Sequence, residues 1–117
     1  MSQSIYHITI SERWTQCQFA GEYTPEEFEE DGFIHCSYAS QLLKVAENRY
    51  KGRKNLVLLF IDTSKVTEKI VDENLEGGVE LFPHVYGPLS LSSVVRVEPF
   101  LCKSDGGFEL PEGISDV

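Results

Sequence analysis

Three histidines are the residues of this chain best suited to chemistry, and each one lies in an apolar, strand-like run. His7 lies in IYHI, His35 in FIHC and His84 in FPHVY, and the chain has no other histidine. An imidazole can donate, accept or bind a metal ion near neutral pH. We therefore predict that three distant segments bring their histidines to one site.

His35 has the most informative neighbours. It follows a glycine turn at Gly32 and precedes a helix that Ser37 or Ser40 is expected to cap. Free N–H groups and the positive end of the helix dipole favour an anion such as phosphate at that place. The structural alternative is that His35 caps the helix or bonds a buried carbonyl group.

The strand period of two residues selects the neighbours that share a face with each histidine. His7 is in phase with Thr9, on the face opposite Tyr6 and Ile8, and a half-exposed structural histidine is the alternative for it. His35 is in phase with Phe33 and Ser37, and His84 with Phe82 and Tyr86. Cys36 points away from His35 and so is not a nucleophile paired with it.

The elements that position these residues are read from apolar periodicity and turn residues. The order indicates a single α+β domain with a split, mixed or mostly antiparallel sheet and two to three helices. The domain is expected over residues 1–111, with a loose acidic tail over 112–117 and a flexible connection over 76–78. Strands are predicted at 4–10, 33–36, 56–62, 69–73 and 94–101, with a stiff segment over 79–89 at a sheet edge or bend. Helices are predicted at 12–19 (capped by Ser11), 24–30 and 40–50.

Composition narrows the class of protein. The 117 residues carry a net charge of -9, which disfavours an extended nucleic-acid surface. Three cysteines without a CxxC pair predict a reduced, cytoplasmic protein. No signal peptide is evident and the apolar run 56–61 is too short to span a membrane, so no membrane association is expected. The oligomeric state stays open.

Several long strings resemble the domain of unknown function 952 family. The most specific are DGFIHCS at 31–37 and FPHVYGPL at 82–89, and IYHIT at 5–9 and GFELP at 107–111 extend the resemblance over nearly the whole chain. Asp31 stands where a glutamate is expected. The resemblance implies a fold similar to that of ADP-ribosyltransferases, which hold NAD in a cleft of a split sheet.

The resemblance also implies that the strand with His7 and Thr9 contacts a ribose of NAD or a related nucleotide, and it makes Glu73 and Tyr86 candidates by residue type. His35 with Ser37 would bind phosphate at the start of the helix. Glu73 would stabilise the positive charge that develops when an N-glycosidic bond breaks, since a carboxylate near that carbon lowers the barrier. The expected catalytic residues are Glu73 and His35, and the cofactor-binding residues are His7, Thr9, Phe33, His35, Ser37, His84 and Tyr86, with Phe33 or Tyr86 stacking on a base.

Two other interpretations stay open. A non-catalytic module that binds a small molecule or nucleotide needs only the same pocket. Three histidines also suffice for a zinc site with an open position. However, no two histidines have the i, i+2 or i, i+4 spacing and there is no HExxH, so no metal is expected.

Overall fold

The computed structural model describes residues 4–75 and 77–114 of the chain. It confirms a single α+β domain with three helices and antiparallel sheets. The helices are α1 (Ser11–Cys17), α2 (Phe28–Asp31) and α3 (Ala39–Arg49), with short 3-10 turns η1 (Thr63–Lys65) and η2 (Leu91–Ser93). The strands are β1 (Ser4–Ile10), β2 (Glu22–Tyr23), β3 (Ile34–His35), β4 (Leu56–Asp62), β5 (Lys69–Glu73), β6 (Phe82–Tyr86), β7 (Leu89–Ser90) and β8 (Val94–Pro99).

The predicted strand at 56–62 is the centre of the main sheet. This sheet has the order β1-β4-β8, and β4 pairs with β1 from Ser4↔Asp62 to Ile10↔Leu56. Its continuous apolar run fits because both faces of β4 are covered. The strand pairs found among the described residues are all antiparallel, which agrees with the mostly antiparallel alternative of the prediction and not with a mixed sheet.

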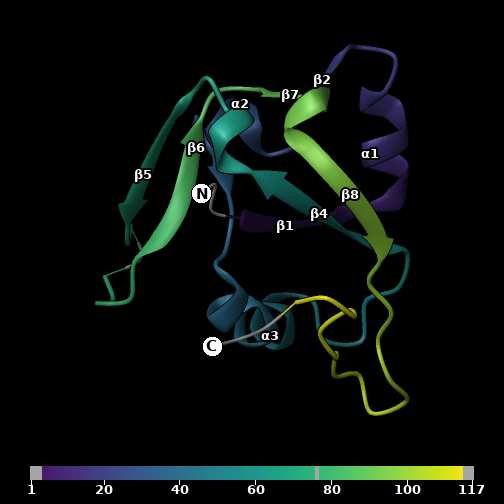
Figure 1. Ribbon diagram of the computed structural model, residues 1–117. Coiled ribbons are helices and arrows are strands. Elements are labelled where there is room, and N and C mark those ends of the chain that lie inside the picture. The colour runs from purple at the N-terminus through teal and green to yellow at the C-terminus, as the bar shows by residue number, and fades with distance from the viewer. Residues whose placement is uncertain (1–3, 76, 115–117) are drawn as a thin grey trace.

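Helices cover both faces of the main sheet (Figure 1). On one face Ile5 and Leu59 pack with Cys17 of α1. On the other face Ile8 packs with Leu42 of α3. Because both faces of β1 lie under other elements, His7 is buried at 3% exposure, and it is not half-exposed.

A second sheet, of order β3-β6-β5, stands beside the first (Figure 1). A bridge between Tyr6 and Ser37 joins the end of β3 to β1, through N–H···O bonds of 2.8 Å in both directions. The β3–β6 register places His35 directly opposite His84. This pairing brings together two of the three histidines from segments far apart in the sequence.

Several predicted helix ends differ from the structure. The expected helix at 24–30 forms only over Phe28–Asp31, because Pro25 and its neighbours make a turn in which the Phe28 N–H bonds the Pro25 carbonyl. The first helix begins at Ser11 itself, with Ile10 as its N-cap, and ends at Cys17. The last predicted strand ends at Pro99.

The cap of α3 also differs from the prediction. Its N-cap is Tyr38, whose N–H donates to the side-chain oxygen of Gln41 at 3.0 Å. Neither Ser37 nor Ser40 has this role. The N–H of Ser37 donates instead to the carbonyl of Tyr6.

The C-terminal segment folds back onto the α3 side of the molecule (Figure 1). Phe108 stacks on Phe100, and Leu110 and Ile114 pack against the same core cluster. Residues 115–117 of the predicted tail and residue 76 of the predicted flexible connection lie outside the described residues. None of the helices in the described ranges has the length and apolar character that a membrane crossing requires.

Candidate functional site

Two histidines, each paired with a carboxylate, form the centre of the candidate site. His35 Nε2 lies 3.1 Å from Asp31 Oδ2, and His84 Nδ1 lies 2.9 Å from Glu73 Oε2. A carboxylate accepts the N–H of the ring and so fixes which nitrogen carries the proton. In each neutral ring the second nitrogen then presents a lone pair.

A glycine turn explains one of these pairs, and the pairing of two neighbouring strands explains the other. Gly32, with φ of 78°, ends α2 in the left-handed conformation and turns the chain back, so that His35 reaches Asp31. On the second sheet, Val71 is the cross-strand partner of His84, and Glu73 lies two residues after Val71. Side chains two residues apart share a sheet face, so Glu73 and His84 meet diagonally.

Phe33 fixes the planes of both imidazole rings. Its ring stacks on His84 at 4.2 Å between centroids with an interplanar angle of 19°, and it lies 4.7 Å from the ring of His35. The two imidazoles are themselves 5.0 Å apart in an edge-to-face arrangement. Phe33 is 7% exposed, so it packs behind the histidines.

His7 has a different environment from the other two histidines. Its Nδ1 lies 2.6 Å from the main-chain carbonyl of His35 and its Nε2 lies 2.8 Å from the hydroxyl of Tyr23. Burial lowers the pKa of His7 to about 4, so the ring is neutral, with Nδ1–H donating to the carbonyl and Nε2 accepting from the hydroxyl. Both nitrogens are in use, and His7 therefore positions His35 rather than offering a nitrogen to a ligand.

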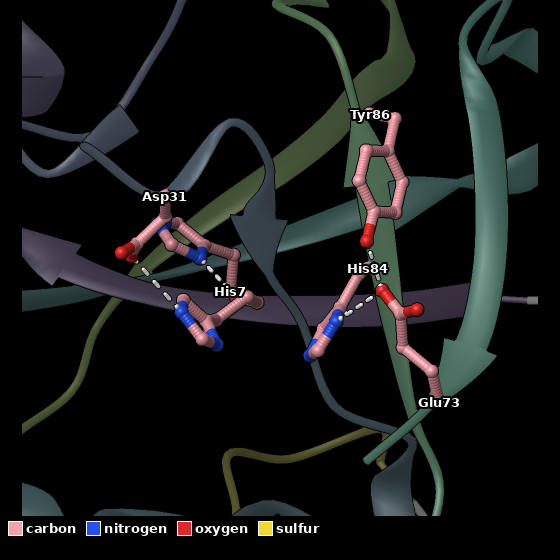
Figure 2. Close-up of polar contacts among 6 residues, drawn as sticks. His7, Asp31, Glu73, His84 and Tyr86 are labelled. Carbon is pink, nitrogen blue, oxygen red and sulfur yellow. Dashed lines mark hydrogen bonds and ion pairs between the residues drawn. The ribbon is translucent and has the colours of Figure 1, made fainter. Parts of the chain in front are cut away.

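Glu73 accepts from two donors at once (Figure 2). The hydroxyl of Tyr86 and the Nδ1–H of His84 both point at its Oε2. These two hydrogen bonds, that of Tyr86 first, lower the pKa of Glu73, and the carboxylate raises the pKa of Tyr86. Glu73 is thus held as a carboxylate that orients His84.

A pocket of about 490 Å³ opens beside the two histidines. It extends from them along β1 to one side of α3 and to the segment between β5 and β6. One end is rich in imidazole and hydroxyl groups, and the remainder mixes apolar, charged and amide side chains. The lining residues are Tyr6, His7, Ile8, Glu27, His35, Cys36, Ser37, Lys44, Val45, Asn48, Arg49, Tyr50, Glu73, Asn74, Leu75, Glu80, Phe82 and His84.

The structure brings most of the predicted site residues to this pocket. Its lining contains five of the eight: His7, His35, Ser37, Glu73 and His84. The other three lie nearby but do not line it. Phe33 and Tyr86 pack against the histidines and Glu73, and Thr9 lines a smaller cavity of about 210 Å³ beside Arg53.

Asp31 and Tyr23 are the partners that sequence reasoning missed. Asp31 was noted only as a departure from the family pattern, yet its carboxylate holds the ring of His35. Its position four residues before His35, across a glycine turn, was a usable signal. Tyr23 offered no local signal, because its contact with His7 arises only when β2 and α1 pack on β1.

This arrangement can bind a polar ligand and move protons. An imidazole with one nitrogen on a carboxylate and the other open is the arrangement of a general base or acid. Within residues 4–75 and 77–114, no group of three or more His, Cys, Asp or Glu side chains is arranged to hold a metal ion.

The sequence places this fold and site in one family. The profile of the protein family of unknown function DUF952 matches residues 8–97, and the chain belongs to that family. The resemblance drawn from the histidine motifs is therefore confirmed. A search of functionally curated proteins finds no match.

Solved structures of a relative share the whole fold. The crystal structure of protein CC0527 from Caulobacter crescentus superposes with a TM-score of 0.82 at 31% identity, covering 92% of this chain and 94% of that one. The solution NMR structure of the same protein gives a TM-score of 0.72 at 30% identity over 89% and 90% of the two chains. The similarity thus includes the main sheet and the histidine-bearing sheet together.

Proposed function

We propose that this protein binds a small nucleotide-type ligand, NAD or a relative of it, in the pocket beside His35 and His84. The observation that carries the proposal is the convergence of these two carboxylate-paired imidazoles at one end of a pocket of about 490 Å³. Pockets for cofactors and small ligands fall in this range of volume and have few, well-placed polar groups.

The lining residues fit such a ligand. Tyr50 and Phe82 offer aromatic surface, and Asn48 offers an amide that can pair with a base or a ribose. The imidazole pair supplies donors and acceptors for the polar end. An NAD molecule would supply an N-glycosidic bond, and an ADP-ribosyltransferase-like reaction at that bond is the enzymatic form of the proposal.

The geometry changes the role that we assign to Glu73. Because its Oε2 is taken by His84 and Tyr86, Glu73 acts through His84 as a positioning residue. His84, with Nε2 open, becomes the proposed acid–base group of the site. His35, held by Asp31, is the second such group.

The direct test is a titration of NAD, ADP-ribose and AMP followed by NMR of the histidine ring protons. Binding in the pocket should shift the signals of His35 and His84 and leave the enclosed ring of His7 nearly unchanged. The His84→Gln variant should weaken binding by at least about tenfold, which corresponds to 1.4 kcal/mol. Absence of any shift at millimolar ligand would count against the proposal.

Turnover separates the enzyme from a binding module. Release of nicotinamide from NAD, measured by chromatography, should depend on His84 and His35 if the site is catalytic. If NAD binds and no product forms over hours, the protein is a non-catalytic nucleotide-binding module. The variant Ser40→Ala, at an exposed position of α3, is a suitable control because Ser40 does not line the pocket.

A further inference from the structure

Three polar atoms at the histidine end of the pocket have no partner within the described residues. They are Nδ1 of His35, Nε2 of His84 and the hydroxyl of Ser37. In the described ranges, every fully buried side-chain nitrogen or oxygen has a hydrogen-bond partner. These three atoms must therefore be reached from the pocket that their residues line, although Ser37 and His84 are only 5% and 4% exposed.

The sheet register aims the three side chains at the same space. His35 and Ser37 lie two residues apart on one strand face, and His84 is the direct partner of His35 across the sheet. Just beyond this pair, the Cys36 N–H bonds the Pro83 carbonyl at 3.0 Å, so the ladder continues toward Ser37. The ring edge of His84 that carries Nδ1 turns to Glu73 on β5, which leaves Nε2 on the side away from β5 (Figure 2).

We infer that these three atoms form a phosphate-binding end of the pocket, and that the ligand of the proposed function enters with its phosphate group there. The inference rests on the proposed function and names the part of the ligand that the histidines contact. In the complex, the N–H at the open nitrogen of each imidazole and the serine hydroxyl each donate a hydrogen bond to a phosphate oxygen. Hydrogen bonds between charged groups of this kind are about twice as strong as neutral ones.

The surrounding charges bear on which groups can hold a phosphate. The chain carries a net charge of -9. Lys44, on the α3 wall, already forms an ion pair of 2.5 Å with Glu80. Each imidazole, in contrast, meets a carboxylate at one nitrogen and leaves the other nitrogen to the pocket.

Both carboxylates beside the imidazoles already accept hydrogen bonds. Asp31 faces the opposite side of the His35 ring, and Oε2 of Glu73 already accepts from two donors. The titratable and charged groups around the imidazole pair are Asp31 of α2, Glu73 of β5, Tyr86 of β6 and His7 of β1, with Lys44 and Arg49 of α3, Glu27 and Glu80 further along the pocket.

AMP and adenosine differ only in the phosphate group. Comparing their affinities therefore isolates the contribution of this end of the pocket.

The test compares AMP with adenosine by isothermal titration calorimetry in one buffer. We expect AMP to bind at least about tenfold more tightly than adenosine. Inorganic pyrophosphate should compete with AMP.

Variants locate the phosphate. His35→Gln, at a half-exposed position, should lower the affinity for AMP to that for adenosine. Ser37→Ala should weaken the binding of AMP several-fold and leave the binding of adenosine unchanged. Ser40→Ala should alter neither affinity. His84→Gln should resemble His35→Gln, and His35→Gln alone decides the matter if the buried substitution at position 84 unfolds the chain.

The outcomes distinguish the two proposals. Equal affinities for AMP and adenosine would overturn the phosphate assignment while the nucleotide pocket stands. Loss of AMP binding equally in Ser37→Ala and Ser40→Ala would overturn it as well. If neither AMP, adenosine nor NAD binds, the proposed function itself fails.

Discussion

The imidazole of His7 lies 2.6 Å from the main-chain carbonyl oxygen of His35, and this contact crosses from the main sheet to the strand that bears the pocket. Its second nitrogen accepts from Tyr23, which is fully buried. One histidine thus fixes the backbone of another, and the two have different physical roles although their sequence settings are alike.

Replacing His7 should therefore affect stability more than a replacement of His35 does. His7→Ala removes two buried hydrogen bonds, leaves the Tyr23 hydroxyl and the His35 carbonyl without their partner, and opens a cavity. We expect a loss of about 3 kcal/mol in the free energy of unfolding, measured by urea denaturation. His35→Ala, at a half-exposed side chain, should cost under about 1 kcal/mol. Equal losses in the two variants would contradict the assignment.

The buried state of His7 also predicts a pH dependence of stability. Its pKa falls from 6.5 to about 4 on folding, so the unfolded chain binds more protons between these values. The contribution of neutral His7 to the free energy of unfolding is then fully present above pH 6.5. It declines as pH falls toward 4, by up to about 3 kcal/mol.

The measurement is urea denaturation at several pH values between about 7 and 4.5, a window above most carboxylate titration. His7→Gln, which does not titrate, should show a flatter slope over this window. An unchanged slope in that variant would mean that other groups control the effect.

Glu73 should set the tautomer of His84. With its carboxylate in place, the proton of the neutral ring resides on Nδ1, which donates to Glu73. Two-dimensional nitrogen–proton NMR of the ring should therefore report Nδ1–H in the native protein. In Glu73→Ala the ring should shift toward the Nε2–H tautomer that free imidazole favours, and binding of AMP should weaken by about tenfold. Retention of the native tautomer would show that Glu73 does not orient the ring.

Gly32 and Gly21 provide a matched pair of substitutions. Both have φ near 79° and open space where a Cβ would lie, so alanine at either position costs only backbone strain of about 1–2 kcal/mol. Only Gly32 lies between Asp31 and His35. We expect similar losses of stability by thermal denaturation, and a loss of ligand binding in Gly32→Ala alone. Equal binding in both variants would show that the turn does not control the Asp31–His35 pair.

Phe33 should act on the site through ring packing. Phe33→Leu keeps an apolar side chain but removes the stack on His84 and the contact with His35. We expect a cost of about 1–2 kcal/mol in stability and a weaker, broader histidine response to AMP by NMR, because the imidazole planes are no longer held. If the histidine signals of Phe33→Leu respond to AMP as in the native protein, Phe33 does not hold the imidazole planes.

Local periodicity accounts for what the sequence could predict of the fold. The strands at 4–10, 56–62 and 69–73 were located from alternation and apolar runs, since those patterns report which side chains face a core. The cap of α3 was not predictable in this way. Tyr38 is an unusual N-cap, and it has this place because Ser37 is already bonded to β1.

The sequence by itself determined the family, the α+β class and the three segments that carry the histidines, because long motifs and strand periodicity are local properties of the chain. Only the tertiary structure decided which histidines act together. The β3–β6 register puts His35 opposite His84, whereas the packing of Tyr23 closes both nitrogens of His7. Hydrogen-bond partners that come from distant segments leave no mark in local spacing, and these partners determine which imidazoles stay open to a ligand.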